Sequence, residues 1–181
     1  MTALLIIDML NDFFTSGRLN EHKESLIKHT NELIDAARAK NIPIIWVRQE
    51  YKDDLSDAPL YNRLNNKKVT IEGTDGAQML QKLHQDTNDS VIVKKRYSAF
   101  FNTNLDELLV SLDVNRLIIT GVNTMTCVRT TAIDAYQRDL EVLLALDCVD
   151  GHDTEQHENS IVYLQYAVAK GLHNAEILLA M

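Results

Sequence analysis

The sequence is short of cysteine and of long apolar runs. It has two cysteines in 181 residues, too few for the disulfide framework of a small secreted domain. No apolar run approaches the ~20 residues of a membrane-spanning helix. The run at residues 3–7 is too short for the core of a signal peptide, and it lacks basic flanks. We therefore expect a cytoplasmic protein with no membrane partner.

Basic residues are outnumbered, with 18 Lys and Arg against 26 Asp and Glu and a formal net charge of −8. A field of this sign repels the phosphates of nucleic acids and of anionic membranes. The charge therefore disfavours nucleic acid as a partner and leaves a small-molecule substrate as the expectation. A local basic pocket could still bind an anion.

Glycine is absent from residues 8–14, directly after the first predicted strand. A dinucleotide-binding domain needs a glycine-rich phosphate loop at this position. None of the six histidines is paired with a second ligand at the spacing of a His-Glu-x-x-His metal site. The nearest approach to a cluster, His152 with Asp153 and His157, is better explained as a helix start capped by Thr154. We therefore expect no cofactor and no metal.

Hydrophobic residues make up 45% of the sequence, enough for the core of one domain spanning residues 1–181. Short apolar runs predict strands at residues 4–7, 44–47, 90–93, 116–120, 141–146 and 175–179. Between them, helical spacing predicts helices at residues 24–40, 74–84, 103–111, 124–138 and 155–169. Continuous apolar strands are typical of a parallel sheet buried on both faces. The alternation therefore predicts an α/β fold, with a doubly wound sheet between two helical layers.

One long polar segment, residues 48–73, interrupts this alternation and is closed by Gly73. Loops of this length in compact domains tend to be lids or binding loops. A surface insertion explains the segment equally well, and both interpretations stay open.

Residues suited to covalent catalysis stand at the carboxyl ends of predicted strands, where doubly wound sheets bind ligands. Asp8 ends the first strand, Lys94 ends the third, and Cys127 lies in the turn after the fourth. If a helix begins near Thr124, its unpaired N–H groups favour the thiolate of Cys127. A buried structural cysteine is the alternative, and it is the preferred interpretation of Cys148.

Asp8 and Lys94 could both support such a nucleophile. A carboxylate at the boundary of the core can accept a thiol proton and return it to a leaving amine, although Asp8 could instead cap a turn. Because side chains alternate along a strand, Lys94 and Lys95 point to opposite sides. One of them can face the site, but a surface basic cluster with Arg96 is also open.

Three segments together resemble the isochorismatase-like hydrolases. Residues 4–13 (LLIIDMLNDF) are similar to the family's opening strand and catalytic Asp. Residues 93–100 (VKKRYSAF) resemble its lysine motif, in which the catalytic Lys stands three residues before the Tyr. Residues 121–128 (GVNTMTCV) resemble its nucleophile motif. The segments occur in the family's order and span most of the chain.

The resemblance implies a six-stranded parallel sheet in the order 3-2-1-4-5-6, a catalytic triad of Asp8, Lys94 and Cys127, and a cis peptide between Val122 and Asn123. It also implies an oxyanion hole made by the backbone N–H groups of Asn123 and Cys127. In the implied mechanism, Asp8 takes the thiol proton, the thiolate attacks a carbonyl carbon, and water hydrolyses the thioester. Members usually self-associate, so a homo-oligomer is expected.

Two departures within the family narrow the predicted chemistry. Its nicotinamidases bind a metal through an Asp-x-His and a later His beyond the second strand, whereas this chain has no His from residue 30 to 83. Its isochorismatases act on a vinyl ether and often lack the Cys. Cys127 therefore favours hydrolysis of an amide, carbamoyl or ureido C–N bond. Vinyl-ether hydrolysis, and a non-catalytic binding or redox-responsive protein on the same fold, are the alternatives.

Overall fold

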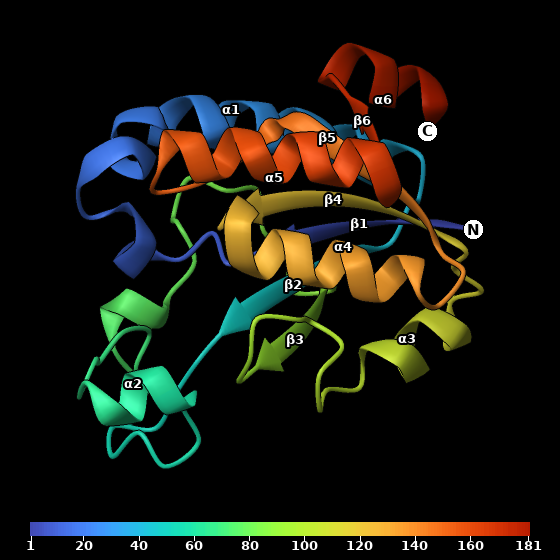
Figure 1. The fold of residues 1–181 in the computed structure, drawn as a ribbon. Coiled ribbons are helices and arrows are strands. Elements are labelled where there is room, and N and C mark those ends of the chain that lie inside the picture. The colour runs from blue at the N-terminus through green and yellow to red at the C-terminus, as the bar shows by residue number, and fades with distance from the viewer.

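Six parallel strands form the centre of the structure, a computed structural model that describes residues 1–181 (Figure 1). They lie in the order β3-β2-β1-β4-β5-β6, which confirms the predicted doubly wound sheet and its strand order. Their bounds are β1 (Thr2–Ile7), β2 (Ile44–Gln49), β3 (Ser90–Lys94), β4 (Arg116–Val122), β5 (Glu141–Asp150) and β6 (Lys170–Leu172).

Helices cover both faces of this sheet. The α-helices are α1 (Gly17–Ala39), α2 (Leu60–Leu64), α3 (Leu105–Ser111), α4 (Arg129–Tyr136), α5 (Thr154–Ala167) and α6 (Asn174–Ala180). Shorter turns are η1 (Asn11–Phe14), η2 (Asp75–Ala77) and the π-helical η3 (Thr124–Val128). The core residues of α1 and α6 pack on one face of the sheet, and those of α3, α4 and α5 pack on the other. The short α2 stands apart, beyond the end of β2 (Figure 1).

Alternate residues of β1 contribute to the two halves of the core. Leu4 and Ile6 face the layer of α1 and α6, whereas Leu5 and Ile7 face α3, α4 and α5. All of these side chains are completely buried, and each stabilises the fold by roughly 1.5–3 kcal/mol relative to an exposed position. Burial on both faces explains why the strand is one continuous apolar run.

No helix is both long enough and apolar enough to cross a membrane.

The last predicted strand is wrong. Residues 175–179 lie in α6, and the sixth strand is the short β6 that precedes it. The helix begins with a capping box, in which the N–H of His173 donates to the Glu176 carboxylate (2.9 Å). Further along, Ile177 is buried while Leu179 is 90% exposed. This burial follows a helix on the surface and not a strand covered on both faces.

The predicted helix at residues 74–84 is also wrong, apart from the single turn of η2. Its backbone pairs instead with the chain that follows β1. The N–H of Asn11 donates to the Gln78 carbonyl (2.9 Å), and the N–H of Leu80 donates to the Met9 carbonyl (2.9 Å). These bonds occupy carbonyl and amide groups that a helix would need for itself.

The remaining predicted helices are present, with shifted ends. The helix expected at residues 124–138 is divided into η3 and α4. At the start of α5 the cap is Asp153 and not Thr154, because the Asp153 carboxylate accepts the N–H of Gln156 (2.8 Å).

The carboxyl ends of β1 and β4 approach each other closely at Gly121. Its φ is +104°, and a Cβ at this position would collide with the carbonyl of Ile7, so only glycine fits. The register of β4 against β5 also shifts between Ile119 and Gly121. The close approach of Gly121 to Ile7 therefore places the turn after β4 next to Asp8, which follows β1.

Candidate active site

Asp8 follows β1 directly and is completely buried. Its φ is 52°, a left-handed conformation that Asp adopts more readily than most residues. Its N–H donates to the Val47 carbonyl (2.8 Å), and its Oδ1 accepts the N–H of Gln49 (2.7 Å). Because both partners belong to β2, these bonds fix the carboxylate at the end of the sheet, and Asp8 does not cap a turn.

Lys94 is the last residue of β3 and is also completely buried. Although β2 lies between β3 and β1, Lys94 Nζ lies 2.7 Å from Asp8 Oδ2. The same ammonium donates to the Arg96 carbonyl (3.1 Å) and to Cys127 Sγ (3.3 Å). Apart from the ion pair, Asp8 Oδ2 has no hydrogen-bond partner. This oxygen is therefore available to take a proton.

The cations that follow Lys94 have a different role. Lys95 points away from the ion pair, as strand alternation predicts. Its Nζ donates to the Glu50 carbonyl (2.6 Å) and pairs with Asp57 (2.9 Å), and Arg96 donates to the Asp57 carbonyl (2.8 Å). The two side chains hold the polar segment after β2 in place and do not form a free surface cluster.

Cys127 lies in η3 and is 4% exposed. Its contact with Lys94 completes a cluster in which the structure brings together Asp8, Lys94 and Cys127, the three residues singled out at the strand ends. Cys148 lies elsewhere, in the core under α1, where its Sγ donates to Asn174 Oδ1 (3.2 Å).

Burial raises the pKa of the Cys127 thiol to about 11, because a buried thiolate loses its hydration. The Lys94 ammonium lowers this pKa, whereas the neighbouring Asp8 carboxylate raises it. Burial alone would lower the pKa of Lys94, but Asp8 and Cys127 outweigh burial and raise it. The expected activation of Cys127 by a helix start is therefore wrong in direction. Burial therefore favours the thiol of Cys127 over its thiolate.

The peptide bond between Val122 and Asn123 is cis. The Asn123 carbonyl accepts the N–H of Thr126 (3.0 Å), but the Asn123 N–H donates to no group of the protein. Asn123 and Cys127 line the same cavity, so this N–H is available to a ligand next to the sulfur. Gly151 makes room for the turn, since a Cβ there would lie 2.8 Å from Asn123 Oδ1.

The cavity beside Cys127 has a volume of about 170 Å³. Half of its twelve lining residues come from the polar segment 48–73, which forms one wall: Gln49, Tyr51, Tyr61, Asn62, Lys67 and Val69. The other half follow the remaining strands: Phe13, Tyr97, Asn123, Thr126, Cys127 and His152. The sequence did not identify the aromatic side chains of this lining. Their one signal was a position after predicted strands, which Phe13, Tyr51, Tyr97 and His152 share.

The two histidines after β5 have separate roles. His152 lines the cavity, whereas His157 hydrogen-bonds through Nδ1 to Thr124 Oγ1 (2.7 Å), behind η3. Burial lowers the pKa of both imidazoles. The structure contains no group of three or more His, Cys, Asp or Glu side chains placed to hold a metal ion.

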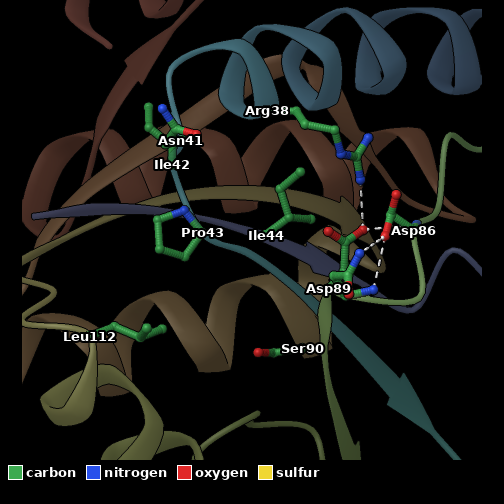
Figure 2. A pocket seen from close by; sticks show the side chains of 10 residues that line it. Arg38, Asn41, Ile42, Pro43, Ile44, Asp86, Asp89, Ser90 and Leu112 are labelled. Atoms are coloured by element: carbon green, nitrogen blue, oxygen red, sulfur yellow. Dashed lines mark hydrogen bonds and ion pairs between the residues drawn. The ribbon is translucent and has the colours of Figure 1, made fainter.

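A larger hollow of about 460 Å³ lies at the opposite edge of the sheet, where β2 and β3 begin (Figure 2). Its carboxylates already have partners. Asp89 Oδ2 accepts from Arg38 (2.8 Å), from the Trp46 indole (2.9 Å) and from the Asp86 N–H (3.1 Å). Asp86 Oδ1 accepts from the backbone and side-chain N–H groups of Asn88 (2.9 and 2.8 Å). Because donors of the protein occupy both carboxylates, this hollow is a structural junction and not a second candidate site.

Known proteins resemble this chain in sequence and in fold. The isochorismatase domain model matches residues 2–176. A probable inactive nicotinamidase of Arabidopsis thaliana is 37% identical over 169 residues, which cover 89% of this chain and 86% of the relative. An isochorismatase family protein from Desulfovibrio vulgaris superposes with a TM-score of 0.89 at 28% identity, covering 99% of this chain and 98% of the other. N-carbamoylsarcosine amidase from Thermoplasma acidophilum gives a TM-score of 0.82 at 26% identity, covering 96% of both chains.

Proposed function

Since the chain belongs to the isochorismatase family of hydrolases, we propose that it is a cysteine hydrolase that cleaves the C–N bond of a small amide, carbamoyl or ureido compound. One observation carries the proposal. The buried thiol of Cys127 contacts the buried Asp8–Lys94 ion pair, and Cys127 also lines a small cavity. Asp8 is the general base and acid, and Lys94 orients it and stabilises charge.

The first step is a proton transfer from Cys127 to Asp8. The raised pKa of the thiol keeps it protonated until a substrate arrives. Asp8 Oδ2 has no competing hydrogen-bond donor besides Lys94. As the proton moves, negative charge passes from the carboxylate to the sulfur, and the Lys94 ammonium contacts both. The negative charge therefore moves between two atoms that both contact the Lys94 ammonium before the reaction begins.

The second step is attack of the Cys127 thiolate on the carbonyl carbon. The backbone N–H groups of Asn123 and Cys127 receive the oxyanion, a role that the unpaired N–H of Asn123 supports. Asp8 then returns its proton to the nitrogen, and the C–N bond breaks to release the amine. Water attacks the resulting thioester, which yields the acid and restores the Cys127 thiol.

The cavity supports a small-molecule substrate. Its volume of about 170 Å³ is below the ~300–1,000 Å³ of pockets for drug-sized ligands. Vinyl-ether hydrolysis is the alternative activity for this family, but it needs no thiol nucleophile. A buried Cys127 in contact with Lys94, which is itself paired with Asp8, favours attack at a carbonyl.

The residues beyond β2 do not fit the metal ion that nicotinamidases of this family bind. No histidine lies there, and the Glu50 carboxylate is paired with Arg48 (3.0 Å). Burial raises the pKa of the Tyr51 phenol well above its ordinary value, so it is a poor anionic ligand. The residues beyond β2 therefore do not support a metal-dependent nicotinamidase.

The Arabidopsis relative is named a probable inactive nicotinamidase, so its name gives no support for nicotinamide as the substrate of this chain. A screen for ammonia release from primary amides, carbamoyl compounds and ureido compounds tests the proposal. We expect turnover by the unmodified protein and by Cys148→Ala, and none by Cys127→Ala. Activity that survives in Cys127→Ala would favour ether-type chemistry, and a completely inert protein would favour a binding role.

We also propose that the chain self-associates. One stripe of α5 packs into the core through Leu164, with Ile161 and Val168 beside it. Its other side exposes Tyr163 and Tyr166, the latter 91% exposed. Light scattering should report an oligomer, and Tyr166→Lys should weaken it. A monomer at all concentrations would refute this proposal.

A further inference from the structure

Resting on the proposed function, we infer that the substrate is a compact carboxylic acid, and that the ammonium of Lys67 at the pocket wall recognises its carboxylate. The proposal narrows the substrate class to small amides, carbamoyl compounds or ureido compounds that carry a second, anionic group. It assigns Lys67 as a specificity-determining residue that takes no part in breaking the bond.

The lining of the cavity carries a positive charge, whereas the whole protein is negatively charged. The chain carries a formal charge of −8, yet none of the twelve residues that line the cavity is Asp or Glu. Lys67 is the one Lys or Arg among them. The nearest buried carboxylate, Asp8, is already neutralised by Lys94. An anion that enters the cavity therefore meets a cation and no uncompensated acid.

Lys67 differs from the other lysines around this site in having no acidic partner. Lys68 pairs with Asp53, and Lys95 pairs with Asp57 (2.9 Å). Lys67 makes no ion pair, and its Nζ lies 5.8 Å from the ring centre of Tyr61, another lining residue. A cation placed over an aromatic face within about 6 Å is attracted to it. The ring therefore keeps the ammonium near the cavity while leaving its donors free.

The backbone of Lys67 is fixed at the end of α2. Its N–H donates to the Asn62 carbonyl (2.9 Å), and its own carbonyl accepts from the Asn62 side chain (3.1 Å). The charge also acts across the pocket, since burial and then Lys67 lower the pKa of His152. His152 lines the same cavity. The field of the ammonium thus reaches the far wall, where a bound substrate would feel it.

The size of the cavity sets the remaining limit. A volume of about 170 Å³ is a few times the ~30 Å³ that one water molecule occupies in the liquid. It accommodates a scissile group and a carboxylate joined by a short spacer. The ring side chains of Tyr51, Tyr97 and Phe13 supply flat apolar contact for such a spacer.

Two alkylating reagents test this inference without a known substrate. Iodoacetate and iodoacetamide both transfer a two-carbon group to a thiolate with loss of iodide, but only iodoacetate is an anion. We would measure the ratio of their rates at Cys127 by peptide mass spectrometry, at low ionic strength, where screening is weakest. The variants are Lys67→Met, Lys67→Arg and the matched control Lys68→Met. Taking the ratio cancels any change in the pKa of the thiol.

We expect Lys67→Met to lower the iodoacetate-to-iodoacetamide ratio about two- to fivefold, the range for a partly exposed ion pair. Lys67→Arg and Lys68→Met should keep the ratio of the unmodified protein. An unchanged ratio in Lys67→Met, with Cys127 still reactive, would overturn the role of Lys67 and leave the proposed function intact. If neither reagent labels Cys127 even at pH 10, where about one in ten thiols of pKa about 11 is ionised, the nucleophile would be overturned, and this inference with it.

Discussion

Replacing Asp8 by Asn should change two properties of Cys127, its rate of alkylation and its rate of hydrolysis, in opposite directions. Alkylation of the thiol should become faster, while hydrolysis should be lost. Burial, and then the Asp8 carboxylate, hold the pKa of Cys127 at about 11 against the attraction of Lys94. Asn keeps the shape of the side chain and an acceptor for the Gln49 N–H, but it removes the charge and the proton acceptor.

The size of the effect on alkylation can be bounded. At pH 8, a thiol of pKa about 11 is ionised in about one molecule in a thousand, and a thiol at the ordinary 9.0 in about one in ten. Because Cys127 stays buried in the Asp8→Asn variant, we take the ordinary value of 9.0 as the lower limit of its pKa there. The gain in thiolate is then at most about a hundredfold. Because a thiolate of lower pKa is a weaker nucleophile, about tenfold of this gain remains.

The loss of hydrolysis has a different origin. Without Asp8, no group takes the proton of Cys127 or returns it to the departing amine, and such catalysis is worth about 10²- to 10⁴-fold. Labelling by iodoacetamide against pH, with Cys148 as internal control, measures the first effect, and ammonia release measures the second. A thermal melt must show that the variant is folded, because leaving Lys94 unpaired costs about 3–5 kcal/mol. Slower or unchanged labelling, or undiminished hydrolysis, would refute the reasoning.

Three further predictions follow from the same contacts. Lys94→Met should raise the pKa of Cys127 and slow its labelling at least severalfold, whereas the neighbouring Lys95→Met should leave the labelling profile unchanged. Gly121→Ala should destabilise the fold by about 3 kcal/mol or more in thermal denaturation, because a Cβ meets the β1 backbone. Burial raises the pKa of Cys148 from 9.0 to about 12, so its contribution to stability is complete below pH 9 and is lost as pH rises toward 12. Cys148→Ala should therefore reduce the alkaline loss of stability by up to about 4 kcal/mol, and equal losses in both proteins would contradict this.

The central strands were predictable because their environment is uniform. β1 and β4 are buried on both faces, so each is an uninterrupted apolar run in the sequence. The segment at 175–179 is equally apolar, yet it forms a helix, because composition does not distinguish a short strand from a half-buried helix. The segment at 74–84 has helical spacing, but its backbone bonds to distant residues, which a local pattern cannot include.

The candidate site was predictable where its residues sit at strand ends. Asp8 and Lys94 are such residues, and Cys127 follows the fourth strand closely. The direction of the Cys127 pKa shift was not predictable, since it depends on burial and on Asp8, both of which are tertiary properties. Lys67 lies in a polar segment without periodicity, so nothing in the sequence links it to the cavity.

The central claim is that Cys127 forms a covalent thioester during cleavage of a C–N bond. The most direct measurement is the mass of the peptide containing Cys127 after acid quenching of the protein during turnover of an amide that it hydrolyses. The account predicts a peptide heavier by the acyl part of the substrate, with the amine lost, and no such adduct on Cys148. Turnover without any adduct on Cys127, retained in Cys127→Ala, would contradict it.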